Sequence, residues 1–459
     1  MSAALNNDAF HLRSRAYTGG FVPTTPVGAT SGITTAHTIA GQIAILSAVN
    51  LLARSHPHLV IAVPDAPLLI NSPMGAATLR EACSRLAVAV DPSLIVEMMD
   101  AIPEGMDSMG IGIDAPKASV FVGGLRWTAL VAEEPVAITD DSSSVLGVCM
   151  AVVLAHGYLF RRALGWPSMI PWSMSLFSLE QTSESTGPPE LNPVDVGTVW
   201  LVGAGAVGSC LAWWLRMIGV VGEWHVIDDD VIKQLNLDRS LAFFHRDVEP
   251  GPSTPTYKCD VVAGMLPGAV AHRTRWDDFR RLGYPTPDVI IPVANEDSVR
   301  AMVTYLGHPA VIHATTGREW TSELHRHLPG SDGCLSCRLP ADMPQFACAG
   351  GDVSASSEET QGDAALPFLS AGAGLLLVAG LLQLQDGKWE RHDRNHWRVH
   401  FAGPVITSSR WSCTANCQSL PLPAVRAEIH RSTRWIDLDR EVVDSISKAR
   451  SACSDHGKE

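Results

Sequence analysis

The sequence predicts an α/β protein built from two unequal copies of one plan, and three observations support this. Residues 199–208 (VWLVGAGAVG) and 224–228 (WHVID) are typical of a strand, a glycine turn that opens a helix, and a second strand ending in a carboxylate. Long helices of small apolar residues are expected at 142–164 and at 366–384, one in each half. The first half also has a helical run at 40–53 before a strand at 58–65 that ends in Asp65.

The first half, residues 1–190, is predicted to be a degenerate copy of the second, residues 191–459. It has no Gly-x-Gly-x-x-Gly, no Asn-Leu-x-Arg and no paired cysteines, so it cannot make the same phosphate cradle. The polar, proline-rich stretch 181–193 predicts a linker, which places the boundary near residue 190. Because the repeat rests on pattern alone, an unrelated α/β domain stays open for the first half.

The glycine turn of the second half is suited to a nucleotide phosphate. Gly203 permits the tight turn, Gly205 lets backbone amides approach a phosphate, and Gly208 lets the helix sit close to the sheet. Asp228 ends the next strand, where an acid can bind a ribose hydroxyl. This Rossmann-like pattern alone would equally suit an NAD-dependent oxidoreductase.

The residues after Asp228 favour a different class. Residues 228–239 (DDDVIKQLNLDR) resemble the Asp-x-Asp and Asn-Leu-x-Arg signature of the ubiquitin-activating and sulfur-carrier adenylyltransferase superfamily, and Lys258 opens an apolar helix as that family's second phosphate-binding cation does. Two cations suit the triphosphate of ATP better than the pyrophosphate of NAD. The resemblance implies an ATP site that contains Asp228, Asp230, Asn236, Arg239 and Lys258.

The magnesium ligand departs from the family pattern. The family usually places an Asp after the strand that corresponds to 288–291, where this chain reads PVANED. Asn295 is the best positional match, and Glu296 or Asp297 are alternatives. An amide oxygen binds Mg²⁺ less strongly than a carboxylate.

Four cysteines predict a structural zinc site. Cys334 and Cys337 form a Cys-x-x-Cys pair, and Cys413 and Cys417 form a looser Cys-x-x-x-Cys pair. Four thiolates can surround Zn²⁺ tetrahedrally and pin the C-terminal segment without taking part in the chemistry. Four buried free thiols are the alternative, and the extra residue in the second pair departs from the family.

Cys348 lies between these pairs, in a stretch of about 340–365 that reads as a surface loop. Thioester-forming members of the superfamily carry their nucleophilic cysteine on a crossover loop at this position. A thiolate attacks an acyl adenylate readily, and the thioester keeps its energy for later transfer. A loop cysteine without a role is the alternative.

Composition limits the partners. The 459 residues include 46 % hydrophobic and 18 % charged residues and carry a net charge of −14, which argues against nucleic acid or acidic lipid as a partner. Without a basic or apolar leader the chain is expected in the cytoplasm, where its ten cysteines would stay reduced. The 366–384 helix is long enough to span a membrane, but its small residues favour a buried core helix and no membrane association.

The resemblance implies ATP-dependent adenylation of the C-terminus of a small ubiquitin-like β-grasp protein, thioester formation on Cys348, and transfer to a conjugating enzyme. Within the superfamily the chain looks most like bacterial activating enzymes with a fused inactive half, several of which act in antiphage defence. Arg13 or Arg15 is a candidate for a cation that the first half contributes to the ATP site, and a homodimer is a further possibility. The alternatives are an adenylyltransferase for a sulfur carrier or peptide without an enzyme thioester, a noncatalytic scaffold, and an NAD enzyme.

Overall fold

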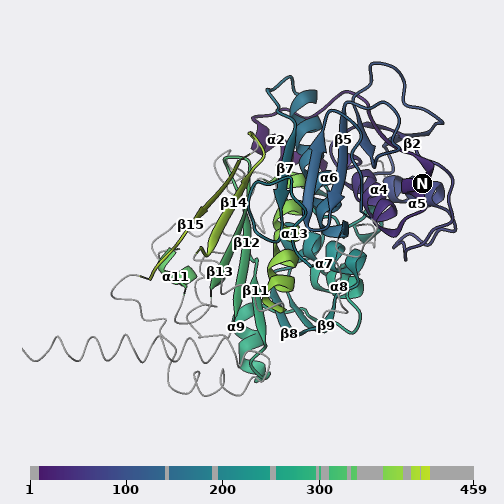
Figure 1. Cartoon of the computed structure of the whole chain (residues 1–459). Helices are drawn as coiled ribbons and strands as arrows, with labels where there is room; N and C mark the ends of the chain where they lie inside the picture. Colours follow the sequence, from purple (N-terminus) through teal and green to yellow (C-terminus); the bar gives the residue numbers. More distant parts are fainter. Residues whose placement is uncertain are drawn as a thin grey trace, which may run out of the picture.

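The computed structural model describes residues 10–139, 144–188, 195–248, 255–295, 299–300, 310–327, 332–338, 365–385, 394–403 and 405–413. The chain is a mixed α/β protein with two large sheets (Figure 1). The expected fold class is therefore confirmed. The boundary near residue 190 lies outside the described residues and stays a prediction.

The first sheet contains seven strands in the order β3-β2-β1-β4-β5-β6-β7. The first five strands in this order are parallel, and β6 and β7 are antiparallel to their neighbours. Its elements in chain order are α2 (Leu12–Thr18), β1 (Val27–Ser31), α3 (Ile33–Ala36), α4 (Ile39–Leu52), β2 (His58–Ala62), α5 (Leu79–Val90), β3 (Ile95–Met98), β4 (Ser108–Ile111), β5 (Val120–Leu125), β6 (Thr128–Ala132), α6 (Ser144–Ala163) and β7 (Trp172–Ser175).

The second sheet repeats this strand order and adds one strand, as β10-β9-β8-β11-β12-β13-β14-β15. Its strands β10 to β12 are parallel and the last three are antiparallel. Its elements are β8 (Asp195–Val202), α7 (Ala206–Ile218), β9 (Val221–Ile227), η1 (Gln234–Asn236), η2 (His245–Asp247), α8 (Lys258–Met265), β10 (Val270–His272), α9 (Trp276–Phe279), η3 (Arg280–Leu282), β11 (Val289–Pro292), β12 (Val311–Gly317), β13 (Thr321–His327), α11 (Leu335–Arg338), α13 (Pro367–Gln385), β14 (His396–His400) and β15 (Val405–Ser409).

The two long apolar helices meet in the middle of the molecule. The α6 helix packs on β5 and β6, the α13 helix packs on β12 and β13, and the two helices contact each other (Figure 1). Both are long and apolar enough to cross a membrane, but 89 % of α6 and all of α13 are buried in the protein over the apolar window. Their apolar surface is therefore used to join the two sheets in one core.

The three helices predicted at 40–53, 142–164 and 366–384 lie within two residues of their expected bounds. The strands β8 and β9 begin four and three residues before the predicted starts at 199 and 224. The first-half strand differs at its other end, because β2 ends at Ala62 rather than at Asp65. Pro64 explains the early end, since proline cannot donate a hydrogen bond to a neighbouring strand. Asp65 therefore does not occupy the strand end that Asp228 occupies in the second half.

Candidate functional site

The glycine turn between β8 and α7 leaves the start of the helix open. Gly203 has φ +102°, and a Cβ there would lie 2.5 Å from the backbone nitrogen of Ala294. A Cβ on Gly208 would lie 2.4 Å from the carbonyl oxygen of Gly203. A Cβ on Gly205, which precedes α7, would meet no atom within 4 Å. Packing therefore requires the first and third glycines, whereas the second borders free space at a helix N-terminus, where an anion is favoured.

Asp228 is fixed at the end of β9 by the same turn. Its carboxylate accepts hydrogen bonds from the backbone N–H groups of Ala204 (2.6 Å) and Asp230 (2.9 Å). Burial raises the pKa of Asp228 above its ordinary value, although the charge of Lys258 and the two N–H donors act in the opposite direction. Each oxygen keeps a second lone pair that can accept a hydrogen bond from a hydroxyl.

Lys258 and Asp230 form an ion pair beside Asp228. The Lys258 Nζ lies 2.6 Å from Asp230 Oδ2, and the Lys258 backbone nitrogen donates to the Asp230 carbonyl oxygen at 2.9 Å. The Lys258 side chain is 11 % exposed and the Asp230 side chain is 46 % exposed. The pair therefore presents its acid to solvent, at the edge where β9 ends.

The segment that carries Asn236 and Arg239 is folded back on itself. Asn236 Oδ1 accepts from the Lys233 N–H at 2.8 Å and closes the η1 turn. Arg239 Nη1 donates to the Leu235 carbonyl and lies 3.1 Å from Asp238 Oδ1. Both predicted phosphate-binding side chains are nearly buried, and their contact with a phosphate stays a prediction.

The α2 helix of the first half contacts the second half at two points of this site. Asp238 Oδ2 accepts from the backbone N–H (3.1 Å) and the hydroxyl (2.9 Å) of Ser14. Tyr17 donates its hydroxyl proton to the Gly317 carbonyl at 2.5 Å and accepts from the Trp320 N–H at 2.9 Å. The helix that carries Arg13 and Arg15 therefore reaches from the Asn236–Arg239 segment to the turn between β12 and β13.

Asn295 is an exposed residue just beyond β11. Its backbone carbonyl oxygen accepts from Arg300 Nη2 at 3.1 Å. Glu296 and Asp297, the alternative magnesium ligands, lie outside the described residues. Asn295 follows Ala294, whose backbone lies against Gly203, so this position is at the same edge of the sheet as the glycine turn.

Three of the four predicted zinc ligands lie together. The thiols of Cys334, Cys337 and Cys413 are within 4.8 Å of one another, and the Cys334 N–H donates to Cys413 Sγ at 3.2 Å. Three converging thiols fit the donor chemistry of Zn²⁺. Cys417 and Cys348 lie outside the described residues, as does most of the loop at 340–365.

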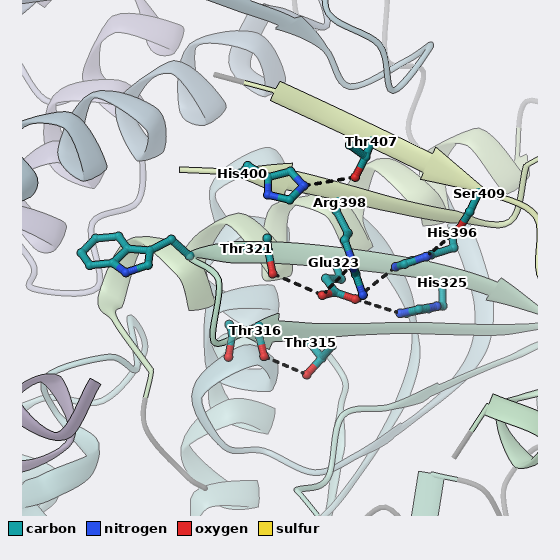
Figure 2. A network of polar contacts seen from close by, with 12 residues as sticks. Thr315, Thr316, Thr321, Glu323, His325, His396, Arg398, His400, Thr407 and Ser409 are labelled. Atoms are coloured by element: carbon teal, nitrogen blue, oxygen red, sulfur yellow. Dashed lines mark hydrogen bonds and ion pairs between the residues drawn. The ribbon is translucent and has the colours of Figure 1, made fainter. Parts of the chain in front are cut away.

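A buried polar network that the sequence analysis did not single out lies on β13 and β14 (Figure 2). Glu323 Oε2 lies 3.1 Å from His396 Nε2 and 3.7 Å from His325 Nε2, and Glu323 Oε1 lies 3.1 Å from Arg398 Nε. The side chains share one face because residues alternate along a strand, and Glu323 is opposite Arg398 while His325 is opposite His396. The Glu-x-His and His-x-Arg spacings were the available signal.

The Glu323 network does not fit a shared metal ion, although three donor atoms lie within 4.8 Å. The rings of His325 and His396 stack with centroids 4.2 Å apart and planes 8° apart, so an ion in the plane of one ring is outside the plane of the other. Trp411 donates to His396 Nδ1 at 2.9 Å, which places the proton of a neutral His396 on Nε2, facing Glu323. Burial opposes ionisation, but the hydrogen bonds of His325 and His396 and the charge of Arg398 lower the pKa of Glu323 below its ordinary value.

The turn of the first half that corresponds to the glycine turn is filled by an acid. The Asp114 carboxylate accepts from the N–H groups of Thr34 (2.6 Å) and Thr35 (3.3 Å) and from the Thr35 hydroxyl (2.5 Å) at the start of α3. Partial burial opposes ionisation, but these hydrogen bonds outweigh it and lower the pKa of Asp114. A negative charge already occupies the place where a phosphate would approach.

In a comparison with known proteins, no family model matches the chain. An uncharacterized protein of Sinorhizobium fredii, y4jF, is 28 % identical over 248 residues, which are 51 % of this chain but only 45 % of the relative's own length.

Solved structures of Escherichia coli MccB align with about half of the chain. The complex with ATP gives 16 % identity and a TM-score of 0.34 over 48 % of this chain and 64 % of MccB. The complex of this Microcin C7 biosynthetic enzyme with N-formylated MccA gives 17 % identity and a TM-score of 0.36, over 48 % of this chain and 66 % of MccB. Likenesses at these scores assign no function.

Proposed function

We propose that the second half binds ATP and adenylates the C-terminal carboxylate of a small ubiquitin-like protein. The supporting observation is that an open helix N-terminus at Gly205 and the Lys258–Asp230 ion pair both lie at the carboxyl edge of the parallel part of the second sheet, after β8 and β9. This is the edge where open α/β sheets bind their ligands. A dinucleotide site would need the glycine turn and Asp228 but not the two cations that follow.

In this proposal each residue has a distinct part. Asp228 accepts from the ribose, while Asn236, Arg239 and Lys258 surround the triphosphate. The carrier's carboxylate oxygen attacks the α-phosphorus, the bond to the β-phosphate oxygen breaks, and pyrophosphate leaves. Cations stabilise the negative charge that builds on the phosphoryl oxygens.

The metals have separate parts. Magnesium would be held by Asn295, or by Glu296 or Asp297, and would neutralise phosphate charge. Zinc on Cys334, Cys337, Cys413 and Cys417 would hold the C-terminal segment in place and leave no position open for a substrate.

The second step of the proposal takes place on Cys348. Its thiolate attacks the acyl carbon of the adenylate, AMP leaves, and the thioester is passed to a conjugating enzyme. The partners are then soluble proteins in the cytoplasm, and a role in antiphage defence suits such a pathway. Since α2 contacts Asp238, we include Arg13 or Arg15 as a further cation at the ATP.

The alternative function is adenylation without an enzyme thioester, for a sulfur carrier or a peptide C-terminus. ATP–pyrophosphate exchange with candidate β-grasp proteins that end in glycine tests the shared first step, and its absence with every carrier would contradict both functions. Intact mass after incubation with ATP and the carrier tests the second step. Cys348→Ala should keep the exchange and lose a thiol-sensitive adduct, whereas Cys348→Ser should give an adduct that resists thiols. Full product formation by Cys348→Ala would favour the alternative.

A further inference from the structure

Arg54 is a fully buried cation of the first half whose side chain contacts the backbone of the second half. It follows α4, and its side chain is 0 % exposed. Its Nη1 donates to the Leu237 carbonyl, and its Nη2 donates to the carbonyls of Leu241 (3.1 Å) and Phe243 (3.0 Å). Three carbonyl oxygens of one short segment therefore converge on one guanidinium.

Asn50, one turn earlier on α4, completes this arrangement. Its Oδ1 accepts from Arg54 Nε at 3.0 Å, and its Nδ2 donates to the Leu241 carbonyl at 3.1 Å. Asn50 thus orients the planar guanidinium from the last turn of α4 towards the segment. Burial lowers the pKa of Arg54 to about 10, which still leaves it protonated at neutral pH.

The residues that Arg54 contacts lie on both sides of Arg239 in the sequence. Leu237 lies two residues before Arg239 and Leu241 two residues after it, and the Arg239 carbonyl itself accepts from Cys210 Sγ at 3.6 Å. Within the part of the chain that the structure describes, no carboxylate pairs directly with Arg54, and Asp238 and Asp247 act on it only at longer range. A buried cation whose charge is balanced mainly by backbone carbonyls makes displacement of those carbonyls costly.

We propose that Arg54 is a positioning residue. Through Arg54 the first half, whose own turn is filled by Asp114, fixes the backbone of the segment that carries Asn236 and Arg239. The segment is then held where these two side chains can contact the triphosphate. This inference rests on the proposed function for the role of the segment, but the fixing of the segment by Arg54 can be measured separately. Arg54 acts through backbone carbonyls of the segment. Its removal should therefore change the position of the Arg239 side chain and leave the number of positive charges beside the nucleotide unchanged.

The test compares Arg54→Met with Gln42→Met, a matched change at a fully buried polar residue of α4, the helix that precedes Arg54. Gln42 is also fully buried, and among the described residues its side chain bonds to Ala36, Pro67 and Leu69, which all belong to the first half. Hydrogen–deuterium exchange of the 236–244 backbone and the KM for ATP in pyrophosphate exchange are measured for both variants. Arg54→Met should accelerate amide exchange in 236–244 and raise the KM, each at least tenfold, whereas Gln42→Met should leave both within twofold of the native protein.

Two results would overturn the inference: native exchange rates in 236–244 for Arg54→Met, or equal acceleration in Gln42→Met. Should Arg54→Met not fold, Arg54→Lys and Asn50→Leu replace it. Each keeps part of the contact and should give smaller changes in the same direction, and native values for both would overturn the inference. If the native protein shows no ATP turnover, the proposed function fails, while the exchange rates still decide whether Arg54 fixes the segment.

Discussion

Alanine substitutions at two neighbouring glycines separate the packing of the turn from its proposed contact with phosphate. Gly203→Ala places an L residue at φ +102°, which costs about 1–3 kcal/mol, and brings a Cβ to 2.5 Å from the Ala294 nitrogen. Because a backbone atom must move, a further cost of about 1–3 kcal/mol is expected. The free energy of unfolding should therefore fall by roughly 2–6 kcal/mol, a large share of the stability of a typical domain.

Gly205→Ala should have the opposite profile. Its φ of −73° suits any residue and its Cβ meets no atom, so the free energy of unfolding should change by less than about 1 kcal/mol. The same Cβ would stand where the phosphates approach the start of α7, so ATP should bind at least about tenfold more weakly, or 1.4 kcal/mol.

Urea unfolding followed by tryptophan fluorescence measures the first quantity, and calorimetric titration with ATP measures the second. Native ATP affinity in Gly205→Ala would refute the claim that phosphates lie against this turn. A loss of stability in Gly205→Ala as large as that in Gly203→Ala would refute the assignment of separate roles to the two glycines.

Three further predictions concern acid stability, the first-half turn and zinc. Burial lowers the pKa of His56 from 6.5 to about 4, so the unfolded chain binds the proton first and stability falls as the pH drops from 6.5 towards 4; at pH 5.5 the loss is on the order of 1 kcal/mol. Urea midpoints at pH 7.5 and 5.5 should differ less in His56→Gln, and an unchanged difference would contradict this. Asp114→Ala leaves the α3 amides uncapped and should lower the free energy of unfolding by about 1–2 kcal/mol, while ATP still binds once per chain; two ATP per chain would be the contrary result. Elemental analysis should find one zinc per chain in the native protein and little in Cys334→Ser, and a metal-free native protein would exclude the zinc site.

The sequence could predict the elements whose signals are local. The glycine turn, the acid after β9 and the long small-residue helices follow from spacing and hydrophobicity, and the structure has them where expected. The prediction that β2 extends to Asp65 is wrong because Pro64 stands before that carboxylate and cannot donate to a neighbouring strand. The proline is also a local signal, so the end of this strand is within reach of the sequence.

The contacts between the halves could not be predicted in this way. Ser14 meets Asp238 and Arg54 meets Leu237 across more than 180 residues of sequence, and neither residue belongs to a motif. In the sequence Arg54 is an ordinary arginine after a helical run, and its role depends on the distant segment that contains Leu237, Leu241 and Phe243. The Glu323 network likewise depends on the register of β13 against β14, which pattern alone does not set.

Calorimetric titration of the native protein with ATP, AMP and NAD tests the central claim most directly. The account predicts saturable binding of ATP at one site per chain and no binding of NAD. Binding of NAD together with no heat from ATP or AMP would contradict it.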